Sequence, residues 1–137
     1  MHTTEITRDN FETTIQSGIV LLDCWANWCG PCRAFAPVYE AVAAKNPDVV
    51  FGKVDTEAQP ELADAFGIRA IPTLMAFRDG ILLMARPGMM GEKQLSELLT
   101  QIRNLDMDDI RRKVEQEEAK RGGHRHAHGV GAARTGT

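Results

Sequence analysis

Short apolar runs along the first three quarters of the chain predict the strands of a sheet. Two of them, at residues 19–25 and 49–55, are almost continuously apolar and predict central strands buried on both faces. Two more runs, "TLMAF" and "ILLMA", lie on either side of Asp79–Gly80, a dipeptide typical of a tight β-hairpin turn. We therefore expect a sheet with two central strands and a hairpin.

Apolar residues spaced three and four positions apart predict helices between these strands. Thr7 looks like the N-cap of a first helix that places Phe11 and Ile15 on one face. A second helix should begin near Cys32 and be kinked by Pro37, which lacks an N–H group. Its expected inward-facing residues are Phe35, Val38, Tyr39 and Val42.

Two more helices complete the pattern. Pro60 should open a short helix that ends before Gly67, and a longer helix should begin near Glu92. The apolar stripe of the longer helix is Leu95, Leu98, Leu99 and Ile102. The resulting order, (β)αβαβαββα, predicts an α/β fold with a mixed central sheet flanked by helices on both faces.

Composition and charge narrow the class of protein. The chain has 137 residues, of which 43% are hydrophobic and 26% charged, as in a globular domain. The net charge of −3 and the absence of a basic cluster give no reason to expect a nucleic-acid partner. No apolar run is long enough to span a membrane, and the polar start "MHTTEITRDNFETT" does not resemble a signal peptide. We expect a cytoplasmic protein without a membrane partner.

The charge balance changes near residue 104. Residues 1–103 contain nine Lys and Arg against thirteen Asp and Glu, whereas residues 104–137 contain seven against six. We expect a domain at 1–103, an appended charged helix at 104–121 and a disordered tail at 122–137.

The appended helix should be stabilised mainly by its charges. Asp106 can cap it, and the acidic residues of the first turn suit the helix dipole. Five pairs of opposite charge are spaced i,i+4: Asp108–Arg112, Asp109–Lys113, Arg111–Glu115, Lys113–Glu117 and Glu117–Arg121. The apolar stripe of Met107, Ile110 and Val114 is thin. This helix either only adds solubility or docks a partner or a second copy of the chain.

Two of the three cysteines lie in "WCGPC", and three kinds of site can be built from such a pair: a zinc site, a structural disulfide or a redox pair. Cys29 follows a central strand and lies at the start of the next helix, where free N–H groups and the helix dipole favour a thiolate. Cys32 is one turn further on, within reach of a mixed disulfide at Cys29. Pro31 stiffens the turn and Gly30 leaves room for a substrate chain. This arrangement favours redox exchange.

The other two kinds of site are less well supported. A structural disulfide is unusual in a reducing compartment, and a zinc site commonly needs four ligands. The only other cluster of metal-binding side chains is His124, His126 and His128, in the tail. An extended tail could chelate a metal with two of them, or it could simply be solvated. We expect no metal at the cysteine pair.

The sequence resembles the thioredoxin family over residues 4–103. The resemblance rests on "WCGPC" with Asp23 upstream, Lys53, "IPT" at residues 71–73 and Gly88, in that order. It implies a thioredoxin fold and a protein-disulfide reductase that is recharged by a thioredoxin reductase. It also implies disulfide-containing protein substrates and no bound cofactor beyond a reversible Cys29–Cys32 disulfide. We expect a monomer.

Carried onto this chain, the family pattern assigns roles to individual residues. Cys29 matches the attacking cysteine, Cys32 the resolving cysteine, and Pro72 a cis-proline that faces the active site. Asp23 matches a buried acid and Lys53 its buried partner. The substrate-binding surface should comprise Trp28, Gly30, Pro31, Ala70, Ile71, Pro72, Gly88 and Met89.

The residues themselves leave alternatives at several of these positions. Burial should raise the pKa of Asp23, which would suit a proton acceptor for Cys32, unless the side chain is half-exposed at a strand end. Lys53 could instead be a solvated charge, Trp25 should pack rather than contact substrate, and Met89 could be an ordinary loop residue. Cys24, where the family usually has an aromatic residue, should be a small core residue. A rival function is a binding or chaperone-like module with little redox turnover.

Overall fold

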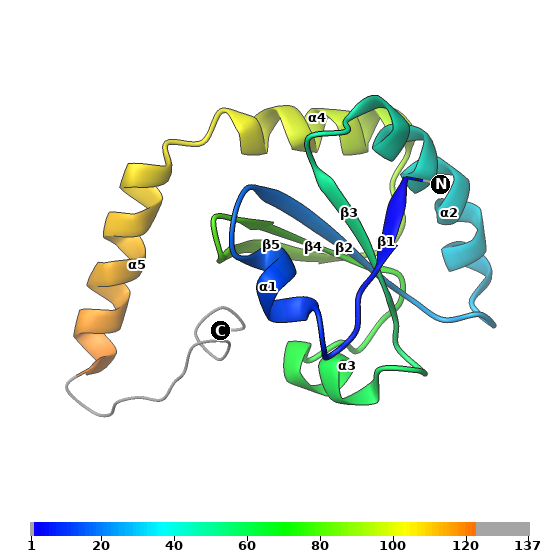
Figure 1. Cartoon of the computed structure of the whole chain (residues 1–137), viewed down its shortest axis with the longest axis horizontal. Coiled ribbons are helices and arrows are strands. Elements are labelled where there is room, and N and C mark those ends of the chain that lie inside the picture. Colours follow the sequence, from blue (N-terminus) through cyan, green and yellow to red (C-terminus); the bar gives the residue numbers. More distant parts are fainter. Residues whose placement is uncertain (1, 123–137) are drawn as a thin grey trace.

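The computed structural model describes residues 2–122 of the chain, and its centre is a five-stranded sheet (Figure 1). The strand order is β1-β3-β2-β4-β5, with β1, β3 and β2 parallel and β4 and β5 antiparallel to their neighbours. The strands are β1 (Thr3–Glu5), β2 (Ile19–Trp25), β3 (Val50–Asp55), β4 (Thr73–Arg78) and β5 (Ile81–Pro87). The predicted mixed sheet and the predicted hairpin are confirmed.

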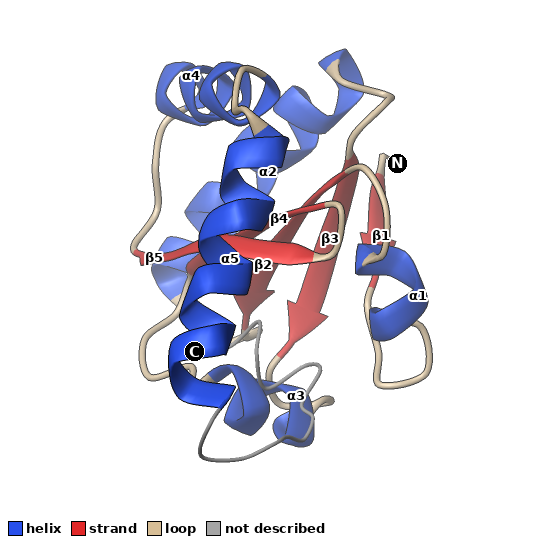
Figure 2. Ribbon diagram, turned by 90° about the vertical axis from the view of Figure 1, so that its left-hand side faces the viewer, coloured by secondary structure: helices blue, strands red, loops and turns tan. Residues whose placement is uncertain are grey.

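Five helices accompany the sheet in the described part of the chain, in the predicted order. They are α1 (Phe11–Ile15), α2 (Gly30–Lys45), α3 (Pro60–Phe66), α4 (Glu92–Arg103) and α5 (Met107–Gly122). Helices α2 and α4 pack on one face of the sheet, and α1 and α3 pack on the other (Figures 1 and 2). The predicted layers, with helices on both faces, are therefore present.

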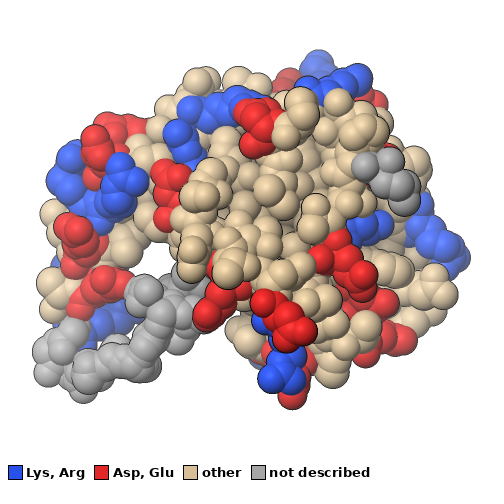
Figure 3. Space-filling view, in the orientation of Figure 1, with Lys and Arg blue, Asp and Glu red and all other residues tan. Residues whose placement is uncertain are grey.

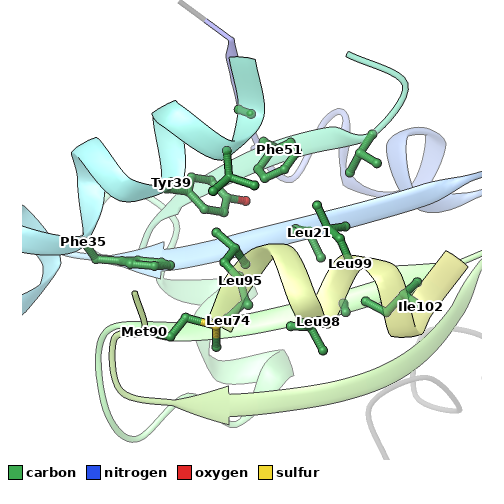
Figure 4. Packing of buried hydrophobic residues seen from close by; sticks show 14 residues of the cluster. Leu21, Phe35, Tyr39, Phe51, Leu74, Met90, Leu95, Leu98, Leu99 and Ile102 are labelled. Atoms are coloured by element: carbon green, nitrogen blue, oxygen red, sulfur yellow. The ribbon is translucent and has the colours of Figure 1, made fainter. Parts of the chain in front are cut away.

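The two faces of the sheet form separate cores because strand side chains alternate in direction. On the α2/α4 face, Leu21 packs with Tyr39 and with the predicted stripe of α4 (Figure 4). On the α1/α3 face, Leu22 packs with Phe11. Neighbouring strand residues thus belong to different cores, and Asp23 shares the α2/α4 face with Leu21.

The beginnings of two helices differ from the sequence prediction. Helix α1 begins at Phe11, after Asn10, so Thr7 is not its N-cap. Thr7 instead closes a turn: its N–H donates to Asn10 Oδ1 (2.8 Å), and its hydroxyl accepts from the N–H of Asp9 (3.2 Å). Local side-chain hydrogen bonds therefore compete with the helix at this point. Helix α2 begins at Gly30, two residues earlier than predicted, which makes Cys29 its N-cap.

Helix α5 lies beside the turn of the β4–β5 hairpin, at the end of the molecule remote from the start of α2 (Figure 1). As predicted, Asp106 caps it, accepting from the N–H of Asp109 (3.2 Å). Met107 is buried, whereas Ile110 and Val114 are half-buried. Arg111 reaches back to the hairpin turn, with its Nη1 3.7 Å from Asp79 Oδ2.

The ion pairs of α5 follow the predicted pattern only in part. Of the five predicted pairs, Asp109–Lys113 (3.1 Å) and Glu117–Arg121 (3.5 Å) form, and the other three do not. Arg111 and Arg112 pair three residues back instead, with Asp108 and Asp109. The result is a surface of interleaved charges over α5 (Figure 3). The helix extends to Gly122, and the rest of the predicted tail lies outside the described residues.

Candidate active site

The two cysteines of "WCGPC" lie at the junction of β2 and α2, and they form a disulfide with a Cα–Cα distance of 5.2 Å. Cys29 is the N-cap of α2, and its sulfur accepts a hydrogen bond from the backbone N–H of Cys32 (3.2 Å). The first N–H groups of a helix have no partner within the helix. A thiolate at Cys29 would therefore gain a hydrogen bond and the favourable end of the helix dipole.

A second segment reaches the disulfide from the α3–β4 connection. The Ile71–Pro72 peptide bond is cis, as the family resemblance implied, and Ile71 O lies 3.7 Å from Cys29 Sγ. The Thr73 hydroxyl donates to Ala70 O (2.6 Å), and this hydrogen bond stabilises the bend at residues 70–73. Within residues 2–122, the backbone N–H of Ile71 has no hydrogen-bond partner. An extended chain could pair with this free edge of backbone.

A third segment follows β5. The N–H of Gly88 donates to Pro72 O (2.8 Å), and Gly88 has φ +94°, a conformation that favours glycine. Met89, next in the chain, is 45% exposed, whereas Met90 is buried in the α2/α4 core. The three segments therefore meet at Cys29, with Met89 facing solvent and Met90 anchoring the loop.

Trp28 is the most exposed large hydrophobic residue of the described chain, with 66% of its surface accessible. Its indole N–H donates to Glu57 Oε2 (2.6 Å), and this bond fixes the orientation of the ring. The sequence analysis did not identify Glu57. Because β2 and β3 are parallel, Glu57, just after β3, lies at the same end of the sheet as Cys29, which follows β2. Among the other predicted substrate-binding residues, Gly30, Pro31, Ala70 and Gly88 are exposed, Ile71 is half-buried and Pro72 is buried.

Asp23 is completely buried in β2, and neither carboxylate oxygen has a hydrogen-bond partner. Burial raises its pKa to about 6, and the nearby charge of Lys53 offsets part of this effect. A carboxyl group with a pKa near neutral can both accept and return a proton under physiological conditions. The half-exposed alternative for Asp23 is therefore wrong.

Lys53 lies beside Asp23 in the β2–β3 register, yet its expected burial is wrong. The side chain is half-exposed, with Nζ 5.1 Å from the centroid of the Trp25 ring. No ion pair joins Lys53 to Asp23 in the described residues. Lys53 instead lines a cavity of about 250 Å³ at this edge, together with Thr3, Glu5, Trp25 and Asp55.

Cys24, unlike the other two cysteines, forms no disulfide. It has no exposed surface, it packs in the α1/α3 core, and burial raises the pKa of its thiol to about 12. Cys24 is therefore a core residue, as predicted.

Within residues 2–122 no cluster of three His, Cys, Asp or Glu side chains could hold a metal ion, and His124, His126 and His128 lie outside this range.

The sequence model of the thioredoxin family matches residues 2–104, which include all three segments of this site. The chain belongs to the thioredoxin family. It is 53% identical over 121 residues to a protein of Streptomyces coelicolor described as putative thioredoxin 2, covering 88% of this chain and 90% of that one. It is 42% identical over 95 residues to a thioredoxin of Chlamydia muridarum, covering 69% of this chain and 93% of the relative.

A solved structure agrees with these relatives. The thioredoxin Mala s 13 of Malassezia sympodialis superimposes with a TM-score of 0.64 at 34% identity, covering 72% of this chain and 89% of that one. Together with the Cys29–Cys32 pair, the family establishes a thioredoxin fold and a thiol–disulfide oxidoreductase that reduces protein disulfides. Thioredoxins carry out this reaction with their own disulfide and without a bound cofactor. No helix among the described residues is long and apolar enough to cross a membrane.

Proposed function

We propose that this thioredoxin reduces target proteins in two exchange steps, with Cys29 as the attacking residue. The Cys29 thiolate attacks one sulfur of a target disulfide, so that a mixed disulfide forms and the other target sulfur leaves as a thiolate. The Cys32 thiolate then attacks the Cys29 sulfur, which closes the Cys29–Cys32 disulfide and releases the second target thiolate. Two electrons pass from the dithiol to the target.

The observation that carries this assignment is the position of Cys29 as N-cap of α2. Its sulfur accepts the N–H of Cys32, and it lies beside the open backbone of Ile71. Cys32, by contrast, lies within the first turn of the helix, one turn from Cys29, which suits the second, intramolecular attack.

Asp23 is the proposed proton acceptor for Cys32. Cys32 must lose its proton before it attacks, and Asp23 is buried on the sheet face that α2 covers. Its pKa of about 6 lets the carboxylate take that proton near neutral pH. Lys53 is proposed to act through its charge on Asp23, since its attraction opposes the rise in the pKa of Asp23.

Target chains are proposed to bind across the exposed surface around Cys29. The free N–H of Ile71 can pair with the backbone of an extended target chain. The exposed side chains of Trp28 and Met89 provide apolar surface for target side chains. Gly30 and Pro31 border the sulfur without bulky side chains. The remaining members of this surface are Ala70, Pro72 and Gly88.

The electron donor that closes the cycle is proposed to be a thioredoxin reductase, with the protein acting as a monomer in the cytoplasm. A dithiol reductant is useful where a donor keeps it reduced, and the cytoplasm is such a compartment.

The test is reduction of insulin by dithiothreitol, with and without the protein. Wild type and Cys24→Ala should accelerate precipitation of the insulin B chain, and Cys29→Ser should not. The Cys24→Ala variant is the control for the loss of one thiol, because it removes a cysteine that takes no part in the proposed exchange. No acceleration by the wild type over dithiothreitol alone would refute the proposal in favour of a binding module.

A further inference from the structure

The charges around the active site are distributed unlike those of the domain as a whole. The three segments that meet at Cys29, residues 27–33, 69–73 and 85–91, contain Arg33, Arg69 and Arg86 but no Asp or Glu. Residues 1–103 as a whole carry more acidic than basic side chains. A cationic strip therefore borders the disulfide of an acidic domain.

All three arginines are exposed, and none of them forms an ion pair within residues 2–122. Within residues 2–122, the guanidinium groups of Arg69 and Arg86 form no hydrogen bond or ion pair, and that of Arg33 donates only to the carbonyl of Asn27 (2.8 Å). Most other arginines of the described chain are held by carboxylates or by carbonyls at a helix end; Arg103, for example, pairs with Asp48. Guanidinium groups left free beside an exposed backbone edge are available to a bound chain.

The fold fixes where these charges lie relative to a target. Arg69 precedes Ala70 and Ile71, whose backbone approaches Cys29, and Arg86 lies opposite Leu74 in the β4–β5 register. Two acidic residues lie on the other side of the site: Asp55 ends β3, and Glu57, which accepts from the Trp28 indole N–H, follows that strand. Strands β2 and β4 lie between β3 and β5 (Figure 2). The acidic residues of the β3 side and Arg86 of β5 are therefore on opposite sides of the centre of the sheet.

We propose that Arg69 and Arg86, with Arg33, select protein targets that carry acidic side chains beside the disulfide to be reduced. This inference rests on the proposed exchange at Cys29 and specifies its substrate class. Exposed charges at the rim of a binding site act mainly on the association rate, over a range of about 10 Å at 0.1 M salt. An acidic target segment would be drawn to the β4–β5 side of the site, whereas a basic segment would be repelled there.

Three cyclic peptides, identical except for residues beside the cysteines, provide the test. Each contains one disulfide flanked by Asp, Lys or Ser, and each rate of reduction is divided by the rate with dithiothreitol alone. For the wild type at about 20 mM salt, the acidic peptide should be reduced about tenfold faster than the basic one. At about 0.5 M salt this ratio should fall towards one, because the Debye length is then only a few ångströms.

The double variant Arg69→Glu/Arg86→Glu should invert the ratio, so that the basic peptide becomes the better substrate. Its fold is checked by circular dichroism, and a uniform loss of activity cancels in the ratio. Arg112→Glu/Lys120→Glu changes the net charge equally on α5, at the other end of the molecule, and should keep the wild-type ratio. An acidic-to-basic ratio near one in the wild type, or the same ratio in wild type and Arg69→Glu/Arg86→Glu, would overturn the inference. If the wild type reduces none of the peptides, including the Ser peptide, the proposed exchange itself fails.

Discussion

The polar groups at the two ends of the central sheet differ in whether they have hydrogen-bond partners. At the end with Cys29, both oxygens of buried Asp23 and the N–H of Ile71 lack partners, and Trp28 is exposed. At the hairpin end, Asp79 Oδ1 accepts from the N–H of Gly18 (3.2 Å), and Arg78 donates to Ile102 O (2.8 Å) at the end of α4.

The difference separates what stabilises this fold from what makes it reactive. A buried carboxylate without hydrogen bonds lowers stability, and an exposed tryptophan forgoes the stabilisation that burying its ring would give. They occur together only where the proposed chemistry needs a proton acceptor and a docking surface, whereas the hairpin end satisfies its polar groups. Local violations of packing rules are expected at functional sites.

The largest expected difference concerns the thiols. In the reduced, folded protein, iodoacetamide should label Cys29 at least about 100-fold faster than Cys24, because only Cys29 has a helix N-terminus that favours its thiolate. Burial and a pKa of about 12 protect Cys24. Mass spectrometry after brief labelling near neutral pH gives the ratio. Comparable labelling of Cys24, Cys29 and Cys32 would contradict the assigned roles.

The second prediction concerns the stability lost at Asp23. Its pKa is about 6 in the folded protein and 3.8 ordinarily, so ionisation opposes folding. The stability of the wild type should therefore fall as the pH rises from about 4 to about 6, and the loss is complete above the folded pKa. Asp23→Asn removes this penalty and should raise the free energy of unfolding by about 3 kcal/mol at pH 8, but by less than about 1 kcal/mol at pH 4.

Denaturant unfolding of both proteins across this pH range measures the difference. A matched change at the hairpin end is Arg78→Ala, which should instead lower stability by about 1–2 kcal/mol at every pH, because carbonyls at the end of α4 lose their donor. A constant difference between wild type and Asp23→Asn from pH 4 to pH 8 would show that the carboxyl group is not protonated by burial.

The smallest effect on activity is expected for removal of α5. A chain ending at Asn104 should reduce insulin within about twofold of the full chain, since α5 contacts the hairpin end and not the site. It should melt a few degrees lower, because Met107 loses its buried environment. A larger loss of activity in a chain that is folded by circular dichroism would place α5 in the function.

Much of the fold could be predicted because the local signals agree with one another. Asp79 and Gly80 have positive φ angles in the hairpin turn, as their dipeptide predicts, and Gly67 ends α3 in the left-handed conformation. The buried stripe of α4 follows directly from its spacing. The family resemblance supplied the cis bond before Pro72, which no local pattern specifies.

The failures have physical reasons that a pattern does not contain. The residue type of Thr7 suits an N-cap. However, the Asn10 side chain accepts from the Thr7 N–H and closes a competing turn, so the helix begins only at Phe11. Lys53 lies beside Asp23 in the β2–β3 register, yet its long side chain places the ammonium group over Trp25 rather than on Asp23. The bond between Trp28 and Glu57 joins residues 29 positions apart and depends on two loops that only the fold brings together.

Cys29 is the sulfur proposed to attack the target, and trapping the mixed disulfide tests this role most directly. Reduced Cys32→Ser protein, mixed with a disulfide-containing protein such as insulin, should accumulate a covalent complex, because the second exchange step is blocked. Dithiothreitol should reduce the mixed disulfide and separate the two proteins. Peptide mapping before reduction should find the target cysteine joined to Cys29. Reduced Cys29→Ser protein should form little or none of it. A complex formed mainly through Cys32 or Cys24, or equal trapping by both variants, would contradict the account.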